Sequence, residues 1–288
     1  PHDLHGEVID KFGSWPSVSV PDTARIEHAV GILTDYVLAY RDASVIVFWS
    51  SDPDRTQHEA GVGSDKGTRA LSGVDRQLGR VLDRLEKSGR KADTDIIIVS
   101  DHGYSTIKGL VDVETQVRDA GFPTGDLPGG VVVADNGGTM LFYVPEHDTE
   151  TADLLAHWLM SQWWCGSIVA SKSIGEIEGV LSANSVGLEG VRAADLTMSF
   201  SWSSESNSAG YKGHVYNMSG GLGLGTHGSM GRSEQRNVMI ASGPSFKSGV
   251  VVHTPTGNID LAPTTLRLLG LDCDIEMDGR VLEEALVD

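Results

Sequence analysis

The sequence has little cysteine, little basic charge and no long apolar run, and each shortage excludes a class of protein. Its two cysteines, Cys165 and Cys273, are too few and too far apart for a zinc knuckle or a disulfide framework. The net charge of -18 argues against binding to nucleic acid polymers or to anionic membranes. No apolar run approaches the roughly 18 residues of a membrane span, and residues 1–10 do not resemble a signal peptide, which favours a cytoplasmic location.

Two stretches with apolar residues at helical spacing are each followed by a short apolar run. Residues 24–40 precede VIVFWS at 45–50, and residues 71–85 precede DIIIVS at 95–100. A buried strand, a helix and a second buried strand in this order predict a parallel βαβ unit. A further strand at 237–242, followed by a helix that Asp260 caps and Gly270 ends, is expected to belong to the same domain.

The middle of the chain has a different character. Asn136-Gly137 separates two β-rich runs, which is typical of a hairpin, and residues 151–164 have a helical pattern with tryptophans on the side expected to pack on a sheet. The serine-rich stretch at 199–210 is expected to be a surface loop. We therefore predict an α/β fold whose core, residues 1–112 and 217–288, is a mostly parallel sheet flanked by helices, with a small α+β insertion at 113–216.

Two Asp/His pairs follow the two early strands. Asp54 and His58 come after the first, and Asp101 and His102 come after the second. Because function collects beyond the carboxyl ends of strands in an open parallel sheet, both pairs are expected at one edge. A carboxylate oxygen with an imidazole suits zinc, and manganese and iron remain alternatives. Each pair alone also fits a turn former with a surface histidine, so the metal hypothesis depends on their joint position.

The loop GGLGLGTHGSMG at 220–231 offers a further imidazole, His227. Its glycines match the G-x-G-x-x-G pattern of dinucleotide-binding loops, but the apolar strand before that pattern and the helix after it are missing. A glycine-rich loop that bends tightly to present His227 at the sheet edge fits better. Just before it, Lys212 and His214 are candidate contacts to a substrate phosphate, although solvated loop residues are the simpler interpretation.

These motifs together resemble those of a known superfamily. The matching stretches are SDPDRTQHEAG (51–61), IIIVSDHGYSTI (96–107), GTHGSMGRSEQRNVMIASGPSFKSG (225–249), NIDLAPTTLRLLGL (258–271) and DGRVL (278–282). In this order they are similar to the alkaline phosphatase superfamily, and within it to the type I phosphodiesterase/nucleotide pyrophosphatase family and to phosphonoacetate hydrolases. The resemblance implies that Asp54, His58 and His227 hold one zinc ion and that Asp101 and His102 hold a second.

The resemblance also implies in-line attack on phosphorus by a Thr or Ser alkoxide, followed by hydrolysis of a phospho-enzyme. No residue of the chain matches that nucleophile or the Asp that accompanies it upstream, so we expect either that Pro1 is not the natural start or that the chain is a catalytically incomplete relative. The expected substrates are small phosphate diesters or pyrophosphates of nucleotides. A phosphonate hydrolase and a non-catalytic metal-binding protein are the alternatives.

Overall fold

The computed structural model describes residues 3–287, and the chain divides into two compact units. Unit 1 comprises Pro1–Thr56, Thr68–Asp101 and Asn237–Asp288, and unit 2 comprises Gln57–Gly67 and His102–Arg236. Unit 2 contains all of residues 113–216 together with flanking segments, and their assignment as a separate insertion stays a prediction. Among residues 3–287, no helix combines the length and the apolar composition needed to cross a bilayer.

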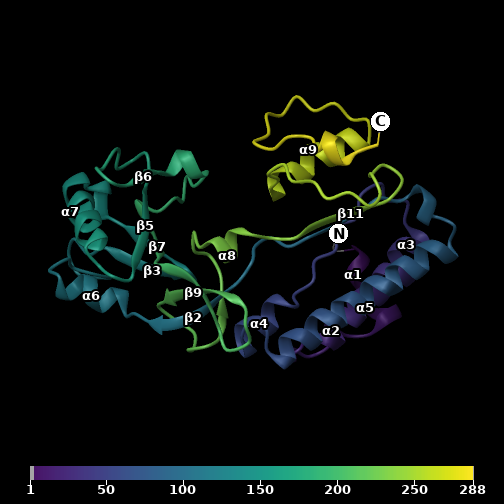
Figure 1. Cartoon of the computed structure of the whole chain (residues 1–288), viewed down its shortest axis with the longest axis horizontal. Helices are drawn as coiled ribbons and strands as arrows, with labels where there is room; N and C mark the ends of the chain where they lie inside the picture. The colour runs from purple at the N-terminus through teal and green to yellow at the C-terminus, as the bar shows by residue number, and fades with distance from the viewer. Residues whose placement is uncertain (1–2, 288) are drawn as a thin grey trace. The chain divides into compact units, whose positions relative to one another are not determined.

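Unit 1 is mainly helical. Its elements are α1 (Asp3–Phe12), α2 (Thr23–Ile32), the π-helical turn Leu33–Val37, α3 (Leu38–Tyr40), β1 (Ile96–Val99), β11 (Met239–Ser242) and α9 (Leu261–Leu268), with short 3-10 turns at Lys91–Asp93, Asn258–Asp260 and Glu283–Ala285. Two further helices, α4 (Asp54–Ala60) and α5 (Asp65–Lys87), each cross a border between the units. The helices predicted at 24–40 and 71–85 are therefore confirmed. In Figure 1, α2 and α5 run side by side, and Ile26 and Ala70 are buried where the two helices face each other.

The sheet of unit 1 differs from the predicted one. Strands β1 and β11 confirm the strands expected at 95–100 and 237–242, but they pair antiparallel, with Ile96 opposite Ser242. Residues 45–50 form no strand, and Val47 and Trp49 are 84% and 73% exposed. A strand needs a hydrogen-bonded neighbour. Among the described residues of unit 1, β1 and β11 pair with each other and neither pairs with residues 45–50. The predicted parallel βαβ unit is therefore wrong for this segment.

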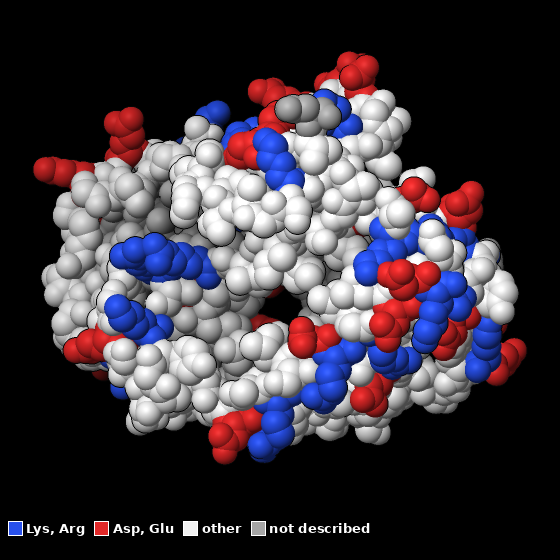
Figure 2. Space-filling view, turned by 45° about the vertical axis from the view of Figure 1, so that its right-hand side comes forward, with Lys and Arg blue, Asp and Glu red and all other residues white. Residues whose placement is uncertain are grey.

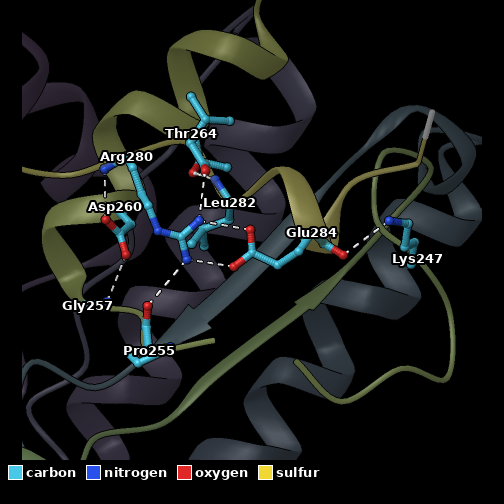
Figure 3. A network of polar contacts seen from close by, with 9 residues as sticks. Lys247, Pro255, Gly257, Asp260, Thr264, Arg280, Leu282 and Glu284 are labelled. Carbon is cyan, nitrogen blue, oxygen red and sulfur yellow. Dashed lines mark hydrogen bonds and ion pairs between the residues drawn. The ribbon is translucent and has the colours of Figure 1, made fainter. Parts of the chain in front are cut away.

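The C-terminal part of unit 1 is held by a polar network around Arg280 (Figure 3). The Arg280 guanidinium donates to both carboxylate oxygens of Glu284, at 2.6 and 2.9 Å, and to the carbonyl oxygen of Pro255 at 3.3 Å. The Asp260 carboxylate accepts from the backbone N–H groups of Gly257 and Arg280, both at 2.9 Å. Gly270 follows α9 at φ +64° and ends the helix as predicted.

Unit 2 contains two mixed sheets. The four-stranded sheet has the order β10-β2-β9-β8, and the five-stranded sheet has the order β3-β4-β7-β5-β6. Only the pairs β2·β9 and β5·β6 are parallel among the described strands, so the α/β class is confirmed but the sheets are mixed rather than mostly parallel. The elements are β2 (Ser105–Leu110), α6 (Val113–Asp119), β3 (Val132–Asn136), β4 (Thr139–Tyr143), α7 (Thr149–Met160), β5 (Cys165–Ala170), β6 (Leu181–Ser182), β7 (Leu196–Phe200), β8 (Trp202–Ser206), β9 (Lys212–Asn217), β10 (Gly225–Thr226) and α8 (Arg232–Gln235), with 3-10 turns at Pro145–His147 and Ala183–Val186.

Helices α6 and α7 are fixed at their starts and pack on the core of unit 2. The side chains of Asp112 and Asp148 accept backbone hydrogen bonds from the first turns of α6 and α7, respectively. Trp164 is fully buried against Phe200, which confirms packing as the role of this tryptophan. Trp163, in contrast, is 67% exposed.

The hairpin predicted around Asn136-Gly137 is confirmed, with its turn displaced by one residue. Asn136 is the last residue of β3 and pairs with Thr139, so that Gly137 and Gly138 form the turn. Gly137 adopts φ +65°, the left-handed conformation that favours glycine.

The surface loop predicted at 199–210 is wrong, because residues 202–206 form β8. This strand is an edge of its sheet, and the serines that suggested a loop are tolerated there because its face is solvated.

Charged side chains are interspersed rather than separated by sign. Figure 2 shows acidic and basic groups side by side over the helical surface at its right-hand side. The amphipathic helix α5 contributes to such a surface, since its polar positions carry aspartate, glutamate, lysine and arginine. The excess of acidic residues is therefore compatible with an ordinary solvated surface.

Candidate metal centre

Helix α4 positions the first predicted pair. Asp54 is its first residue, where a carboxylate is favourable near the positive end of the helix dipole, and His58 lies one turn later on the same face. The Nδ1 atom of His58 lies 3.0 Å from the carbonyl oxygen of Gly225. Because a carbonyl oxygen can only accept, Nδ1 carries the proton, and in the neutral ring the lone pair lies on Nε2.

His102 has the same orientation of its ring. It follows β1 and Asp101, and its Nδ1 atom donates to the carbonyl oxygen of Gly103 at 2.9 Å, which again places the lone pair on Nε2. Gly103 lies so close to the chain near α8 that an added Cβ atom would be 2.1 Å from the carbonyl oxygen of Ser233. Only glycine fits here.

The glycine-rich loop brings His227 to the same place. Gly225 and Thr226 form β10, which pairs antiparallel with β2, and Gly228 turns the chain away at φ +105°. The carbonyl oxygen of His227 accepts from the N–H of Gly138 at 2.7 Å, so the tip of the β3–β4 hairpin supports the loop. The helix that follows, α8, is four residues long and does not open at the glycines. The loop therefore presents an imidazole and lacks the strand–glycine–helix geometry of a dinucleotide site.

Within unit 2 the three imidazoles form one cluster. The rings of His102 and His227 are stacked, with centroids 3.5 Å apart and planes 15° apart, and they offer ring nitrogens within 4.8 Å of each other. The centroid of His58 lies 4.9 Å from that of His227. His58 and His227 thus share one site although they are 169 positions apart in sequence, because Nδ1 of His58 donates to the carbonyl oxygen of Gly225 on β10, the strand that directly precedes His227.

Tyr104 completes the wall of this cluster. Its ring centroid lies 5.3 Å from His58 and 5.4 Å from both His102 and His227. Sequence analysis gave Tyr104 no role, although its place two residues after His102 is a local signal that could have been used. A tyrosine ring against three imidazoles limits their rotation and so fixes the directions of their ring nitrogens.

A buried carboxylate, Glu234 of α8, lies beside the cluster. Burial raises its pKa, while hydrogen bonds from Ser105 and Ser229 and the charge of His102 lower it. Nothing in its local sequence marks Glu234, because every contact that gives it a role is made with residues distant in the chain.

The structure thus brings together His58, His102 and His227, three of the five predicted ligands. Asp54 is one helical turn from His58 and Asp101 directly precedes His102, but both belong to unit 1. The ligand roles of all five residues, and the division into two zinc sites, stay predictions.

The two predicted substrate contacts lie on a strand rather than in a loop. Lys212 and His214 are on β9, where Lys212 is exposed and His214 is largely buried beside β8. The Nδ1 atom of His214 lies 3.8 Å from the Glu205 carboxylate. Among residues 3–287, neither belongs to the cluster of imidazoles, and their contact with a substrate stays a prediction.

Comparison with known families gives one match. The model of the family described as type I phosphodiesterase / nucleotide pyrophosphatase matches residues 6–161, more than half of the chain. This stretch includes α4, His58 and His102. No curated protein sequence matches the chain significantly.

Solved structures with similar folds include nucleotide pyrophosphatases and an alkaline phosphatase. Murine ectonucleotide pyrophosphatase/phosphodiesterase 5 (ENPP5) is 17% identical with a TM-score of 0.64, covering 91% of this chain and 64% of its own. An inactive variant of that protein in complex with AMP is 18% identical with a TM-score of 0.63, covering 94% and 64%. Wild-type alkaline phosphatase PafA is 15% identical with a TM-score of 0.60, covering 92% and 52%. The chain thus has the fold of these proteins and spans less than two thirds of their length.

Proposed function

This chain belongs to the type I phosphodiesterase / nucleotide pyrophosphatase family, and we propose that its imidazole cluster is part of a two-zinc site for hydrolysis of phosphate diesters or pyrophosphates of nucleotides. The observation that carries the proposal is the meeting of His58, His102 and His227 in unit 2. The AMP complex of the murine structure supports a nucleotide as the substrate class.

The residues present fit a zinc ion in their chemistry. His58 and His102 each donate Nδ1–H to a backbone carbonyl, which is the outer-shell contact that fixes metal-binding imidazoles and leaves Nε2 as the ligand atom. We propose that His58, His227 and Asp54 hold one ion and that Asp101 and His102 hold the other. When bound, a pair of such ions stabilises the charge on the phosphoryl oxygens.

The chain's own residues would orient these ligands. Tyr104 packs against all three rings. Because Gly225 and Gly103 have no side chain, the backbone comes close enough for their carbonyl oxygens to accept the Nδ1–H groups of His58 and His102, respectively. For the nucleophile we propose a Thr or Ser on polypeptide upstream of Pro1, so the longer coding sequence is the protein to assay. Lys212 and His214 are proposed as contacts to the substrate phosphate.

The test combines metal analysis with three substrates. The longer chain, prepared without chelator, is analysed for zinc and assayed on a nucleotide phosphodiester, a phosphomonoester and phosphonoacetate. The diester is expected to be hydrolysed fastest. Preference for phosphonoacetate would contradict the proposed substrate class, and bound zinc without turnover of any of the three would contradict catalysis.

A pair of variants tests the ligand assignment. His227→Ala is expected to lower zinc content and to reduce turnover by about 100-fold or more, since even outer-shell changes at metal sites cost 10- to 100-fold. His157→Ala is the control, because His157 is an exposed histidine on α7. Unchanged zinc content in His227→Ala would refute the assignment.

A further inference from the structure

Glu234 carries a buried carboxylate on α8, the helix of four residues that follows the glycine-rich loop and precedes β11 in the chain. It is 2% exposed, and one of its carboxylate oxygens, Oε1, is enclosed without a hydrogen-bond partner among the described residues. The Ser105 hydroxyl is also enclosed without a hydrogen-bond partner among the described residues, and its closeness to the Glu234 carboxyl lowers the pKa of that group. Burying a carboxylate is unfavourable unless its contacts compensate, so these contacts require an explanation.

The side chain of Glu234 holds the loop that carries His227. Its Oε2 atom accepts from the backbone N–H of Ser229 at 2.6 Å, two residues after His227. Ser229 in turn accepts from the N–H of Gly231 through its hydroxyl at 3.0 Å. The carboxylate therefore closes the turn immediately downstream of the imidazole.

The backbone of Glu234 holds the other stacked imidazole. Its carbonyl oxygen accepts from the N–H of Gly103 at 2.6 Å, one residue after His102. One residue thus binds the chain next to both members of the pair whose ring centroids lie 3.5 Å apart.

We propose that Glu234 is a positioning residue that sets the spacing of His102 and His227. As a metal-site role this inference rests on the proposed function. A short, charge-assisted hydrogen bond from a backbone N–H to a buried carboxylate holds a loop more firmly than a neutral contact. A loop held on both sides keeps its imidazole within the narrow tolerance of a metal site, which is about 0.2 Å in ligand distance.

Three variants separate positioning from general stability. Glu234→Ala removes the acceptor of Ser229, whereas Glu234→Gln keeps an oxygen acceptor of the same length. Asp195→Ala is the matched control, because Asp195 is a carboxylate of the same unit, 1% exposed, that accepts the N–H of Val144 at 2.8 Å. Urea unfolding is expected to show both alanine variants destabilised.

The first measurement needs neither metal nor activity. In zinc-free protein, the NMR shifts of the His102 and His227 ring protons report the stacking of the rings, and exchange of the Ser229 amide reports its hydrogen bond. Glu234→Ala is expected to change the ring shifts and to speed that exchange, Glu234→Gln to stay close to wild type, and Asp195→Ala to change neither. Wild-type ring shifts in Glu234→Ala, or equal changes in Asp195→Ala, would overturn the proposal. If Glu234→Ala does not fold, Glu234→Asp takes its place, because its shorter side chain draws the carboxylate away from the Ser229 amide. Altered ring shifts and faster exchange in Glu234→Asp then support the proposal, and wild-type values overturn it.

The second measurement is affinity for Zn²⁺ alone. Glu234→Ala is expected to bind Zn²⁺ about 10- to 100-fold more weakly, as for other outer-shell residues, and Asp195→Ala as tightly as wild type. If wild type binds no Zn²⁺ while the ring shifts respond to Glu234→Ala, the proposed function fails and the positioning stands. If wild type binds Zn²⁺ and Glu234→Ala changes neither affinity nor shifts, the positioning role fails and the function stands.

Discussion

Replacing Gly225 by alanine is expected to disturb the cluster of imidazoles that we propose as a zinc site, and to do so through the backbone. An added Cβ atom would lie 2.7 Å from the carbonyl oxygen of Gln57 and 3.0 Å from Cδ1 of Tyr104. Ordinary contact begins at 3.4 Å, so the Gln57 oxygen or β10 must move by about 0.7 Å. Gln57 directly precedes His58, and its carbonyl accepts from Gly61 at the end of α4, so it cannot yield independently. Overpacking of this kind destabilises by about 1–3 kcal/mol.

The same shift exceeds the tolerance of metal ligands, so the expected loss of Zn²⁺ affinity is at least as large as the 10- to 100-fold seen for outer-shell changes, or about 1.4–2.8 kcal/mol. Urea unfolding followed by circular dichroism measures the stability, and competition with a chromophoric chelator measures the affinity. Gly221→Ala is the control in the same loop, because its Cβ would meet the flexible side chain of Leu224 at 3.1 Å. Equal Zn²⁺ affinity in Gly225→Ala and Gly221→Ala would refute this reasoning.

Two predictions concern groups outside the centre. Burial raises the pKa of the Cys165 thiol to about 12, so at pH 8 iodoacetamide should modify exposed Cys273 and leave Cys165 intact in mass spectra of tryptic peptides; equal labelling of both would contradict this. The hydrogen bond from Arg280 lowers the pKa of Glu284 to about 2 from its ordinary 4.5, so the pair stabilises the folded state above about pH 4.5 and this contribution is lost as pH falls toward 2. In Arg280→Ala the pKa of the Glu284 carboxyl, followed by NMR, should rise from about 2 toward 4.5, and an unchanged low value would exclude Arg280 as the main cause.

The sequence predicted the elements whose signals are local. The helical spacing at 24–40 and 71–85, the hairpin at Asn136 and the end of a helix at Gly270 all proved correct. The failures concern pairing. An apolar run such as 45–50 is compatible with a strand only if a neighbour is present, and β1 and β11 have equal periodicity whether they pair parallel or antiparallel.

In the candidate site, too, residues with a local signal in the sequence were predicted and residues defined by long-range contacts were missed. Residue type and position after a predicted strand selected His58 and His102, although the strand predicted before His58 does not form, and the failure of the flanks to form a dinucleotide motif selected His227. Tyr104 and Glu234 were missed because their contacts join β2, α8 and the glycine loop, which no spacing in the sequence brings together. Lys212 was expected in a loop because the polar residues at the less buried positions of β9 look like those of a solvated loop, although β9 lies between β2 and β8.

The support of His227 by the β3–β4 hairpin has a consequence for how such a protein diverges. The contact is made by backbone atoms, from the N–H of Gly138 to the carbonyl of His227, and added Cβ atoms at Gly137 and Gly138 would lie 2.5 Å from the His227 oxygen and 2.3 Å from the Ser229 nitrogen. Side chains elsewhere on the two strands take no part in it. Substitutions at exposed positions of β3, such as Val132, can therefore accumulate without moving the imidazole as long as the two glycines at the tip remain, whereas Met140 and Phe142 on β4 are fully buried and are constrained by the core.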